Sequence, residues 1–190
     1  MDSYRQIEKY SIEPGVAVEV GTERKHGSTT WLAEYLIGKT DKFFSIDADP
    51  LAGSRLKNNK NVTVVGAKAE EWLSNMAEDT KISFAYMDGY DIEAKDHWPR
   101  WEDSYRGFGY EDGYTVKMCT MSHLLQSIEI SKRAVKGCVV IFDDTVLYWC
   151  MSAGKGALAV PYLISQGFEV VDSREINPGG FSGYVVLVKQ

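Results

Sequence analysis

The chain has 190 residues, of which 44% are hydrophobic and 25% charged, enough for one domain with a full-sized core. Its net charge of −6 argues against a protein that works on nucleic-acid phosphates, because such proteins normally present a basic face. No apolar run approaches roughly 18 residues, no signal peptide opens the chain, and Cys119, Cys138 and Cys150 lack metal-ligand spacing. We therefore expect a soluble cytoplasmic protein with reduced thiols.

Segments typical of strands and helices alternate along the chain. Buried strands are predicted at 16–20, 42–47, 62–65, 82–87 and 138–142. Helices are predicted at 3–10, at 28–37, from Asp49-Pro50 to about 58, around Trp72, Leu73 and Met76, over 115–135, and over 155–166, where Pro161 kinks the helix or marks its start. This alternation is typical of a parallel sheet with helices on both faces.

The end of the chain follows a different pattern. Strand segments at 168–172 and 183–189 are separated by a turn containing Asn177-Pro178-Gly179-Gly180. Two late strands joined by a short connection predict an antiparallel pair at the edge of the sheet. The expected fold is therefore a doubly wound, mostly parallel α/β sheet of seven strands with an antiparallel last strand.

Residues 89–114 interrupt this regular pattern with seven aromatic and seven acidic side chains. A long irregular insertion in a compact domain is usually functional or disordered, and disordered segments are poor in aromatic residues. We expect an ordered lid over a substrate. The alternative is that the aromatic side chains only hold the loop against the domain.

The loop after the first strand has the composition of a ligand site. Gly21 permits a sharp turn and a close approach of a ligand to the backbone, and Ser28 is a favourable N-cap for the helix that follows. Free N–H groups at such a turn suit a carboxylate or a phosphate. The alternative is an ordinary strand-loop-helix connection.

Acidic residues stand at the ends of four of the first five strands: Glu19, Asp47, Asp88 and the Asp143-Asp144 pair. Ligands of open α/β sheets bind outside the carboxyl ends of the strands, where Asp47 is placed to accept hydrogen bonds from ribose hydroxyls. Three carboxylates from neighbouring strands would repel one another unless they are protonated or bridged by a cation. All-oxygen ligands favour Mg²⁺, so Asp88, Asp143 and Asp144 predict a metal site. Alternatively, some of them cap helices or solvate loops.

The order of these motifs resembles that of the class I S-adenosylmethionine-dependent methyltransferases. The motifs are glutamate-x-glycine, the acid of the second strand, G-A-x-A-E, M-D-G and V-V-I-F-D-D. Within that class the chain resembles the metal-dependent small-molecule O-methyltransferases of the catechol and macrolide-sugar (macrocin/mycinamicin) types. The likeness covers roughly residues 14–190 and implies a single Rossmann-like domain over 1–190, with 89–114 as an inserted lid or substrate segment. The sugar type has an aspartate at the position of Asp144, which favours it.

The resemblance also assigns roles by position. Glu19 and Gly21 would shape the pocket for the methionine part of S-adenosylmethionine, Ser28 would contact its carboxylate, and Asp47 would hold its ribose. Gly66, Ala67 and Lys68 would lie against the adenine, with the backbone of Ala67 as a partner. Asp88 would border the cofactor, and Asp88, Asp143 and Asp144 would bind Mg²⁺.

The sequence does not decide which group acts as the general base. The catechol type has a lysine three residues after the aspartate of its fourth strand, and this chain has Asp91 there. Asp91, Asp88 itself, a histidine or the effect of a metal on the acceptor's pKa could serve. Of the histidines, His123 is expected in the core, His97 lies in the lid segment, and His26 flanks the cofactor loop.

The sequence thus predicts Mg²⁺-dependent transfer of a methyl group from S-adenosylmethionine to an oxygen of a small sugar or phenolic natural product, with no membrane or nucleic-acid partner. A homo-oligomer is compatible with it. The alternatives are a metal-independent methyltransferase and a nucleoside-binding protein without catalysis. A nicotinamide-dependent oxidoreductase is disfavoured because no G-x-G-x-x-G follows the first strand. A nucleic-acid methyltransferase is disfavoured by the acidic charge.

Overall fold

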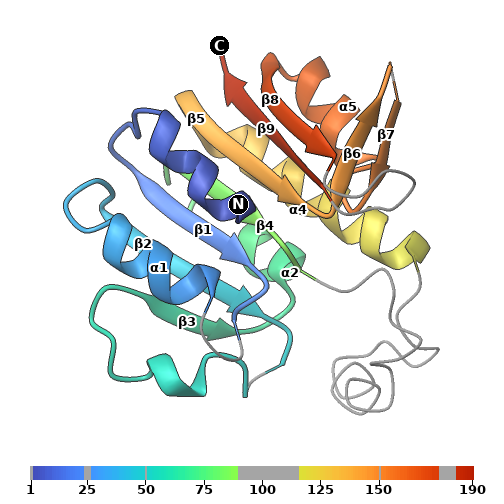
Figure 1. Ribbon diagram of the computed structural model, residues 1–190. Coiled ribbons are helices and arrows are strands. Elements are labelled where there is room, and N and C mark those ends of the chain that lie inside the picture. Colours follow the sequence, from blue (N-terminus) through green and yellow to red (C-terminus); the bar gives the residue numbers. More distant parts are fainter. Residues whose placement is uncertain (1, 24–26, 50, 90–115, 150, 176–182) are drawn as a thin grey trace.

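A computed structural model describes residues 2–23, 27–49, 51–89, 116–149, 151–175 and 183–190. They form a seven-stranded sheet in the order β3-β2-β1-β4-β5-β9-β8 (Figure 1). The strands are β1 (Val16–Val20), β2 (Lys42–Asp47), β3 (Thr63–Gly66), β4 (Ile82–Met87), β5 (Ala134–Asp143), β8 (Phe168–Glu175) and β9 (Gly183–Lys189). β9 runs antiparallel to both of its neighbours, and the pairs among β1 to β5 are parallel. The expected fold class is confirmed.

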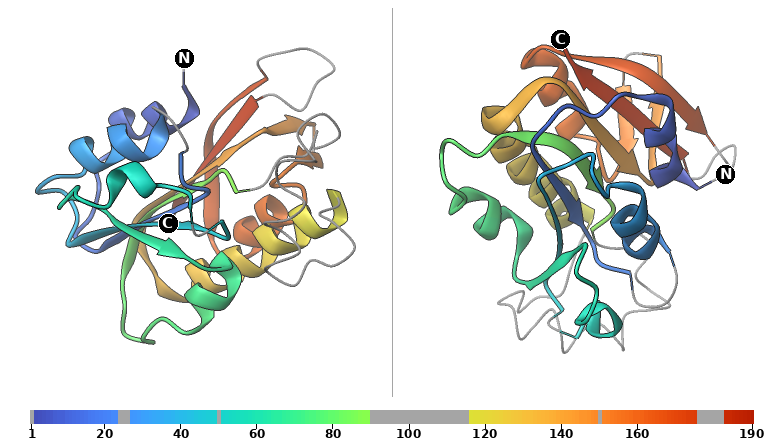
Figure 2. Two further views of the ribbon diagram at one scale, coloured as in Figure 1. Left: turned by 90° about the horizontal axis from the view of Figure 1, so that it is seen from below. Right: turned by 90° about the vertical axis from the view of Figure 1, so that its left-hand side faces the viewer.

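Helices cover both faces of this sheet (Figure 2). The 3-10 helix η1 (Ser3–Lys9) and the helix α1 (Ser28–Tyr35) contribute buried side chains to the core on one face. The helices α2 (Ala69–Ser74), α4 (Val116–Arg133) and α5 (Ala159–Ser165) contribute to the core on the other. Because the strands between these layers are buried on both faces, they read as nearly continuous apolar runs. None of the described helices is long and apolar enough to cross a membrane.

The helix predicted to run from Asp49 to about 58 is wrong. Apart from Pro50, which lies outside the described residues, this stretch consists of turns and one short 3-10 helix, η2 (Ser54–Leu56). The Asp49 side chain does accept a hydrogen bond from the Leu51 amide at 2.9 Å. Gly53, however, has a φ of +64°, and a Cβ there would lie 2.7 Å from Thr22 Cγ2. The segment therefore folds tightly against the loop after β1 instead of continuing as a helix.

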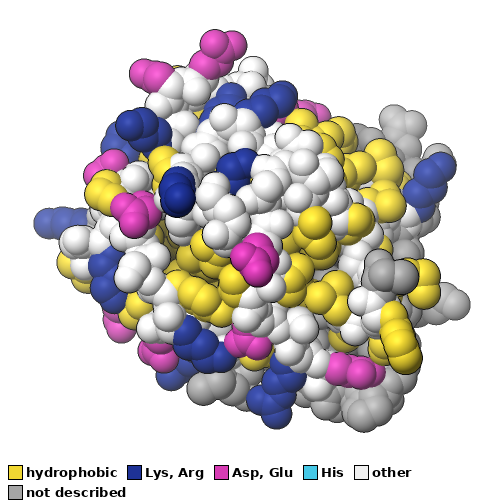
Figure 3. Space-filling view, turned by 90° about the horizontal axis from the view of Figure 1, so that it is seen from above, with side chains coloured by type: hydrophobic (Ala, Val, Ile, Leu, Met, Phe, Trp, Pro, Cys, Tyr) yellow, Lys and Arg dark blue, Asp and Glu magenta, His cyan; other side chains and the backbone are white. Residues whose placement is uncertain are grey.

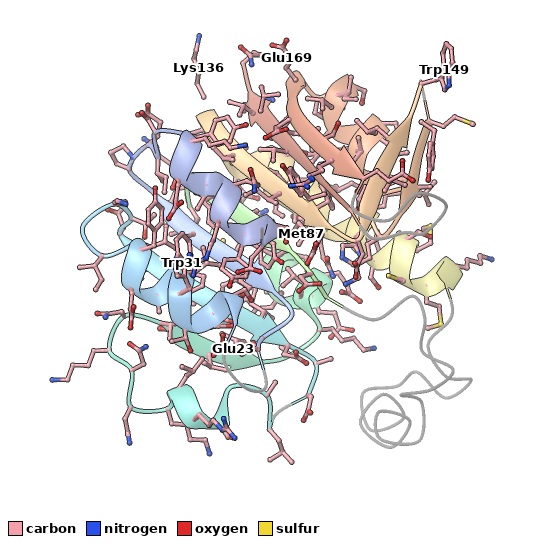
Figure 4. The ribbon with its side chains drawn as sticks, viewed as in Figure 1. Glu23, Trp31, Met87, Lys136, Trp149 and Glu169 are labelled. Atoms are coloured by element: carbon pink, nitrogen blue, oxygen red, sulfur yellow. The ribbon has the colours of Figure 1, made fainter. Side chains whose placement is uncertain are left out.

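A β-hairpin between β5 and α5 was not predicted. It consists of β6 (Thr145–Tyr148) and β7 (Met151–Gly154), which pair with each other outside the main sheet. Its tip lacks the Asn-Gly or Asp-Gly pair that usually signals a hairpin. The turn contains Trp149, which has a φ of +56° and stands fully exposed at the periphery of the molecule (Figure 4). α5 begins at Ala159, so Pro161 lies in its first turn. Of the two alternatives predicted for Pro161, a kink or the start of the helix, the second is observed.

Several sequence-based predictions lie outside the described residues. They are the lid segment from Tyr90 onward, Asp91, His97, His26, Cys150 and the turn at 177–180. Cys119 and Cys138 are buried, reduced thiols, as expected.

Candidate active site

Three loops meet where β1 ends, because β1 lies between β2 and β4. The Gly21 amide donates to the Ile46 carbonyl at 2.8 Å, and the Asp88 amide donates to the Val20 carbonyl at 2.9 Å. Gly21 has a φ of +94°, and a Cβ there would lie 2.5 Å from the Asp88 carbonyl oxygen. Only glycine fits this crossing without displacing the loop after β4. The ends of β1, β2 and β4 are thereby fixed against one another.

Glu19 is a buried carboxylate with one oxygen that has no partner. Ser45 Oγ donates to Glu19 Oε2 at 2.6 Å, whereas Oε1 accepts no hydrogen bond from any described residue. Burial raises the pKa of Glu19 to about 7, although the hydroxyls of Ser28, Ser45 and Thr29 oppose the shift. An unpaired carboxylate oxygen is costly in a protein interior. Glu19 is therefore suited to a ligand that brings an ammonium or another N–H donor.

Asp47 ends β2 next to this group. Its Oδ2 accepts a hydrogen bond from the Thr22 amide at 3.0 Å, and its Oδ1 accepts one from the Asp49 amide at 2.8 Å. A carboxylate oxygen has more than one acceptor position. The geometry suits the vicinal hydroxyls of a ribose.

The segment Gly66, Ala67 and Lys68 lies beside Asp47. Gly66 pairs with Asp47 across the parallel strands β2 and β3, and the Ala67 amide donates to the Asp47 carbonyl at 2.9 Å. The N–H of Ala67 is therefore engaged within the protein. The role expected for this segment beside the adenine stays a prediction, and a ligand there would have to use atoms other than the Ala67 N–H.

Ser28 is not the N-cap of α1, contrary to the sequence-based expectation. Gly27 occupies the cap position, and Ser28 is the first helical residue. The Glu23 carboxylate accepts hydrogen bonds from the Thr30 amide, at 3.0 Å, and from the Thr30 hydroxyl. Glu23 lies beside the start of α1 in Figure 4 and satisfies part of the helix terminus. Because the Ser28 hydroxyl helps to stabilise the charge on Glu19, it belongs to the Glu19 environment.

Asp88 and Asp144 converge on a residue that the sequence reasoning missed, Lys155. Lys155 Nζ lies 2.6 Å from Asp88 Oδ1 and 2.8 Å from Asp144 Oδ2. Although burial alone would lower it, the two carboxylates raise the pKa of the Lys155 ammonium above its usual value. Burial also raises the pKa of Asp88, and Lys155 opposes that shift. No local sequence pattern points to Lys155, because its contact with Asp88 spans 67 residues.

Asp143 has a different partner. Its Oδ2 accepts a hydrogen bond from the Tyr86 hydroxyl at 2.9 Å, and Ser3 Oγ lies 2.9 Å from the same hydroxyl. Asp88 Oδ2 lies 3.5 Å from it. Burial is the main reason that the pKa of Asp143 is raised, with the neighbouring Asp144 adding to it. The three aspartates predicted to be neighbours are therefore close to one another, joined through Lys155 and Tyr86.

This arrangement does not fit the expected Mg²⁺ ion. The ammonium of Lys155 lies between oxygens of Asp88 and Asp144, where a divalent ion bound by those two groups would lie. Among the described residues no group of three acidic, histidine or cysteine side chains is arranged to hold a metal. The predicted need for a bridging cation is thus met by a side chain of the protein.

His123 lies in the core, as expected. It is fully buried on α4, where its Nδ1 donates to the Cys119 carbonyl at 2.8 Å. Its Nε2 has no hydrogen-bond partner among the described residues, and burial lowers its pKa to about 4. A neutral histidine held in this way is a packing residue.

Comparisons with solved structures extend over nearly the whole chain. A candidate methyltransferase from Streptococcus mutans in complex with SAH aligns over 99% of this chain and 96% of its own, with a TM-score of 0.59 and 15% identity. An rRNA methylase from Streptococcus thermophilus aligns over 98% and 93%, with a TM-score of 0.57 and 14% identity. A candidate O-methyltransferase from Klebsiella pneumoniae aligns over 98% and 77%, with a TM-score of 0.55 and 16% identity. The chain has a methyltransferase fold.

These likenesses establish the fold only, since the acceptors named for the neighbours differ and the identities are low. No family model matches the sequence. No curated protein matches it either. In a methyltransferase fold of this kind, ligands bind at the carboxyl ends of the strands, where Glu19, Gly21, Asp47 and Asp88 lie.

Proposed function

We propose that the protein transfers a methyl group from S-adenosylmethionine to a hydroxyl oxygen of a small molecule. The observation that carries this proposal is the buried, unpaired oxygen of Glu19 beside Asp47, in a methyltransferase fold. Glu19 Oε1 offers an acceptor for the ammonium group of the methionine part, and the Asp47 carboxylate offers acceptors for both ribose hydroxyls. The bound cofactor supplies an electrophilic methyl group on a sulfonium.

The acceptor is proposed to bind over β4 and β5, next to the cofactor. Gly21 touches the Asp88 carbonyl, so the cofactor loop and the Asp88 loop are in direct contact. The side chains of Asp88 and Asp144 are about one-third exposed, at 32% and 38%. Asp88 is therefore the group on the described part of the chain best placed to take the proton of an acceptor hydroxyl. Asp91 remains a predicted alternative.

Of the two kinds of methyltransferase that the sequence allows, the metal-independent kind fits these residues better. Positioning supplies most of the rate in methyl transfer from a sulfonium, and a fixed cluster of hydrogen-bond acceptors can position a hydroxyl without a metal. No step of the proposed reaction uses Mg²⁺.

An RNA acceptor is the second possibility, because the structural neighbours include rRNA methylases. The net charge of −6 argues against it. On the face shown in Figure 3, basic and acidic side chains are interspersed, and no continuous basic surface forms there. We therefore favour a small hydroxylated acceptor such as a sugar or a phenol.

Calorimetric titration of S-adenosylhomocysteine tests the cofactor half of the proposal. We expect saturable binding to the wild type, a loss of at least tenfold in affinity in Asp47→Ala, and no change in Asp79→Ala. Asp79 is an exposed aspartate in the loop after α2 and serves as the matched control. Binding of a nicotinamide dinucleotide in place of S-adenosylhomocysteine would overturn the proposal.

A further inference from the structure

Lys155 is an unusual lysine because its charge lies inside the protein, beneath two carboxylates that reach the surface. Its side chain is 3% exposed, compared with 32% for Asp88 and 38% for Asp144. Lysine is almost never fully buried unless it is paired. The two aspartates provide that pairing, and they leave part of their own surface open to solvent.

The backbone fixes Lys155 in this position. Gly154 has a φ of +89°, and a Cβ there would overlap the Asp144 carbonyl oxygen. The Lys155 amide donates to that same carbonyl at 3.1 Å, and the Gly156 amide donates to Thr145 Oγ1 at 2.9 Å. The β6–β7 hairpin therefore returns the chain to the end of β5 and places the Lys155 ammonium on the buried side of the two carboxylates. The backbone contacts of residues 154–156 hold Lys155 in this position.

We propose that the Lys155 ammonium is the resident cation of the acceptor site, taking the place between Asp88 and Asp144 that a divalent ion would otherwise fill. It holds two oxygens, Asp88 Oδ1 and Asp144 Oδ2, in fixed positions. Because a carboxylate group is rigid, fixing one oxygen of Asp88 and of Asp144 also restricts the position of the other oxygen, which remains to contact the acceptor. Lys155 is a positioning residue, since it acts on the acceptor through Asp88 and Asp144.

The charge of the cluster selects the class of acceptor, provided that the proposed methyl transfer is correct. Asp88, Asp143 and Asp144 contribute three negative charges when ionised and Lys155 contributes one positive charge, so the cluster is negative overall. Such a cluster accepts hydrogen bonds from the hydroxyls of a neutral polyol, and it repels a phosphate or a carboxylate. A metal-dependent site would instead attract an anionic oxygen.

Titration with Mn²⁺, followed by the electron paramagnetic resonance signal of the free ion, tests the resident-cation role. We expect no saturable Mn²⁺ site in the wild type. Lys155→Met removes the charge and keeps much of the volume, and it should create a Mn²⁺ site that disappears again in Lys155→Met/Asp88→Asn. Lys132→Met is the matched control, because Lys132 is an exposed lysine paired with Glu129 on α4, and it should create none.

A saturable Mn²⁺ site in the wild type that is lost in Asp88→Asn would overturn the proposal. A folded Lys155→Met that binds no Mn²⁺ would overturn it as well. If Lys155→Met does not fold, the wild-type titration decides alone, since a resident ammonium and a metal cannot share the position. Binding of S-adenosylhomocysteine is measured in the same samples, so failure of the methyltransferase proposal and failure of the resident-cation proposal are separate results.

Discussion

Carboxylates lie on both sides of the close approach between Gly21 and the Asp88 carbonyl, and they are neutralised differently on the two sides. At the end of β1, Glu19 has only hydroxyl partners, and one of its oxygens has none among the described residues. At the ends of β4 and β5, Asp88 and Asp144 are paired with the ammonium of Lys155. An acid left without a cation is suited to a ligand that brings one, whereas an acid that already has a cation is suited to a neutral ligand. This difference supports our proposal that the cofactor binds on the first side and the acceptor on the second.

Loss of Lys155 should have the largest effect on stability. Removing one partner of a buried ion pair leaves its partners uncompensated and typically costs ~3–5 kcal/mol. Because Asp88 and Asp144 are partly exposed, we expect Lys155→Met to lower the free energy of unfolding by about 3 kcal/mol in urea denaturation. Lys132→Met should cost less than about 1 kcal/mol. Equal effects of the two substitutions would contradict the buried pairing.

Glu19→Gln should act in the opposite direction, and its effect should depend on pH. Burial raises the pKa of Glu19 from its ordinary value of 4.5 to about 7, so the folded protein holds a proton that the unfolded chain releases. Stability therefore falls as the pH rises from about 4.5 to 7 and stays reduced above it. Glu19→Gln should be more stable than the wild type at pH 8, by up to about 3 kcal/mol, and nearly equal at pH 4.5.

Urea denaturation of both proteins at the two pH values measures this difference. Glu19→Gln should at the same time weaken binding of S-adenosylhomocysteine, because the amide cannot pair with an ammonium as a carboxylate does. A Glu19→Gln variant that is less stable than the wild type at pH 8 would contradict the claim that the ionised Glu19 destabilises the ligand-free protein.

Gly21→Ala should disturb the contact between the two sides, with a smaller effect. A Cβ at Gly21 would lie 2.5 Å from the Asp88 carbonyl, so the loops after β1 and β4 must move apart. Gly38→Ala is the matched control, since Gly38 also has a positive φ, of +70°, but faces open space. We expect a cost of about 1 kcal/mol for Gly38→Ala, from backbone strain alone, and about 2 kcal/mol for Gly21→Ala. Equal thermal unfolding temperatures for the two variants would show that the loop after β4 can move away from Gly21 without cost.

The sequence predicted the strands β1, β2 and β4 better than the surroundings of Asp88 and Asp144, for a physical reason. The bounds of β1, β2 and β4 follow from apolar runs that end in acids and glycine, and such local patterns are visible in a single sequence. The partner of Asp88 and Asp144 depends on a hairpin with an uncommon turn, which brings Lys155 back over a separation of 67 residues from Asp88. The three aspartates could be placed together from the strand order alone, but the identity of their cation could not. The helix expected after Asp49 failed because Gly53 packs on Thr22, a contact between distant parts of the chain.

The central claim is that cofactor binding needs the Glu19 carboxylate and no metal. Calorimetric titration of S-adenosylmethionine into the wild type and Glu19→Gln, each with excess Mg²⁺ and with chelator, tests it most directly. We predict one affinity for the wild type under both conditions, and at least a tenfold loss of affinity in Glu19→Gln. Binding that disappears with chelator, or that is the same in both proteins, would contradict the account.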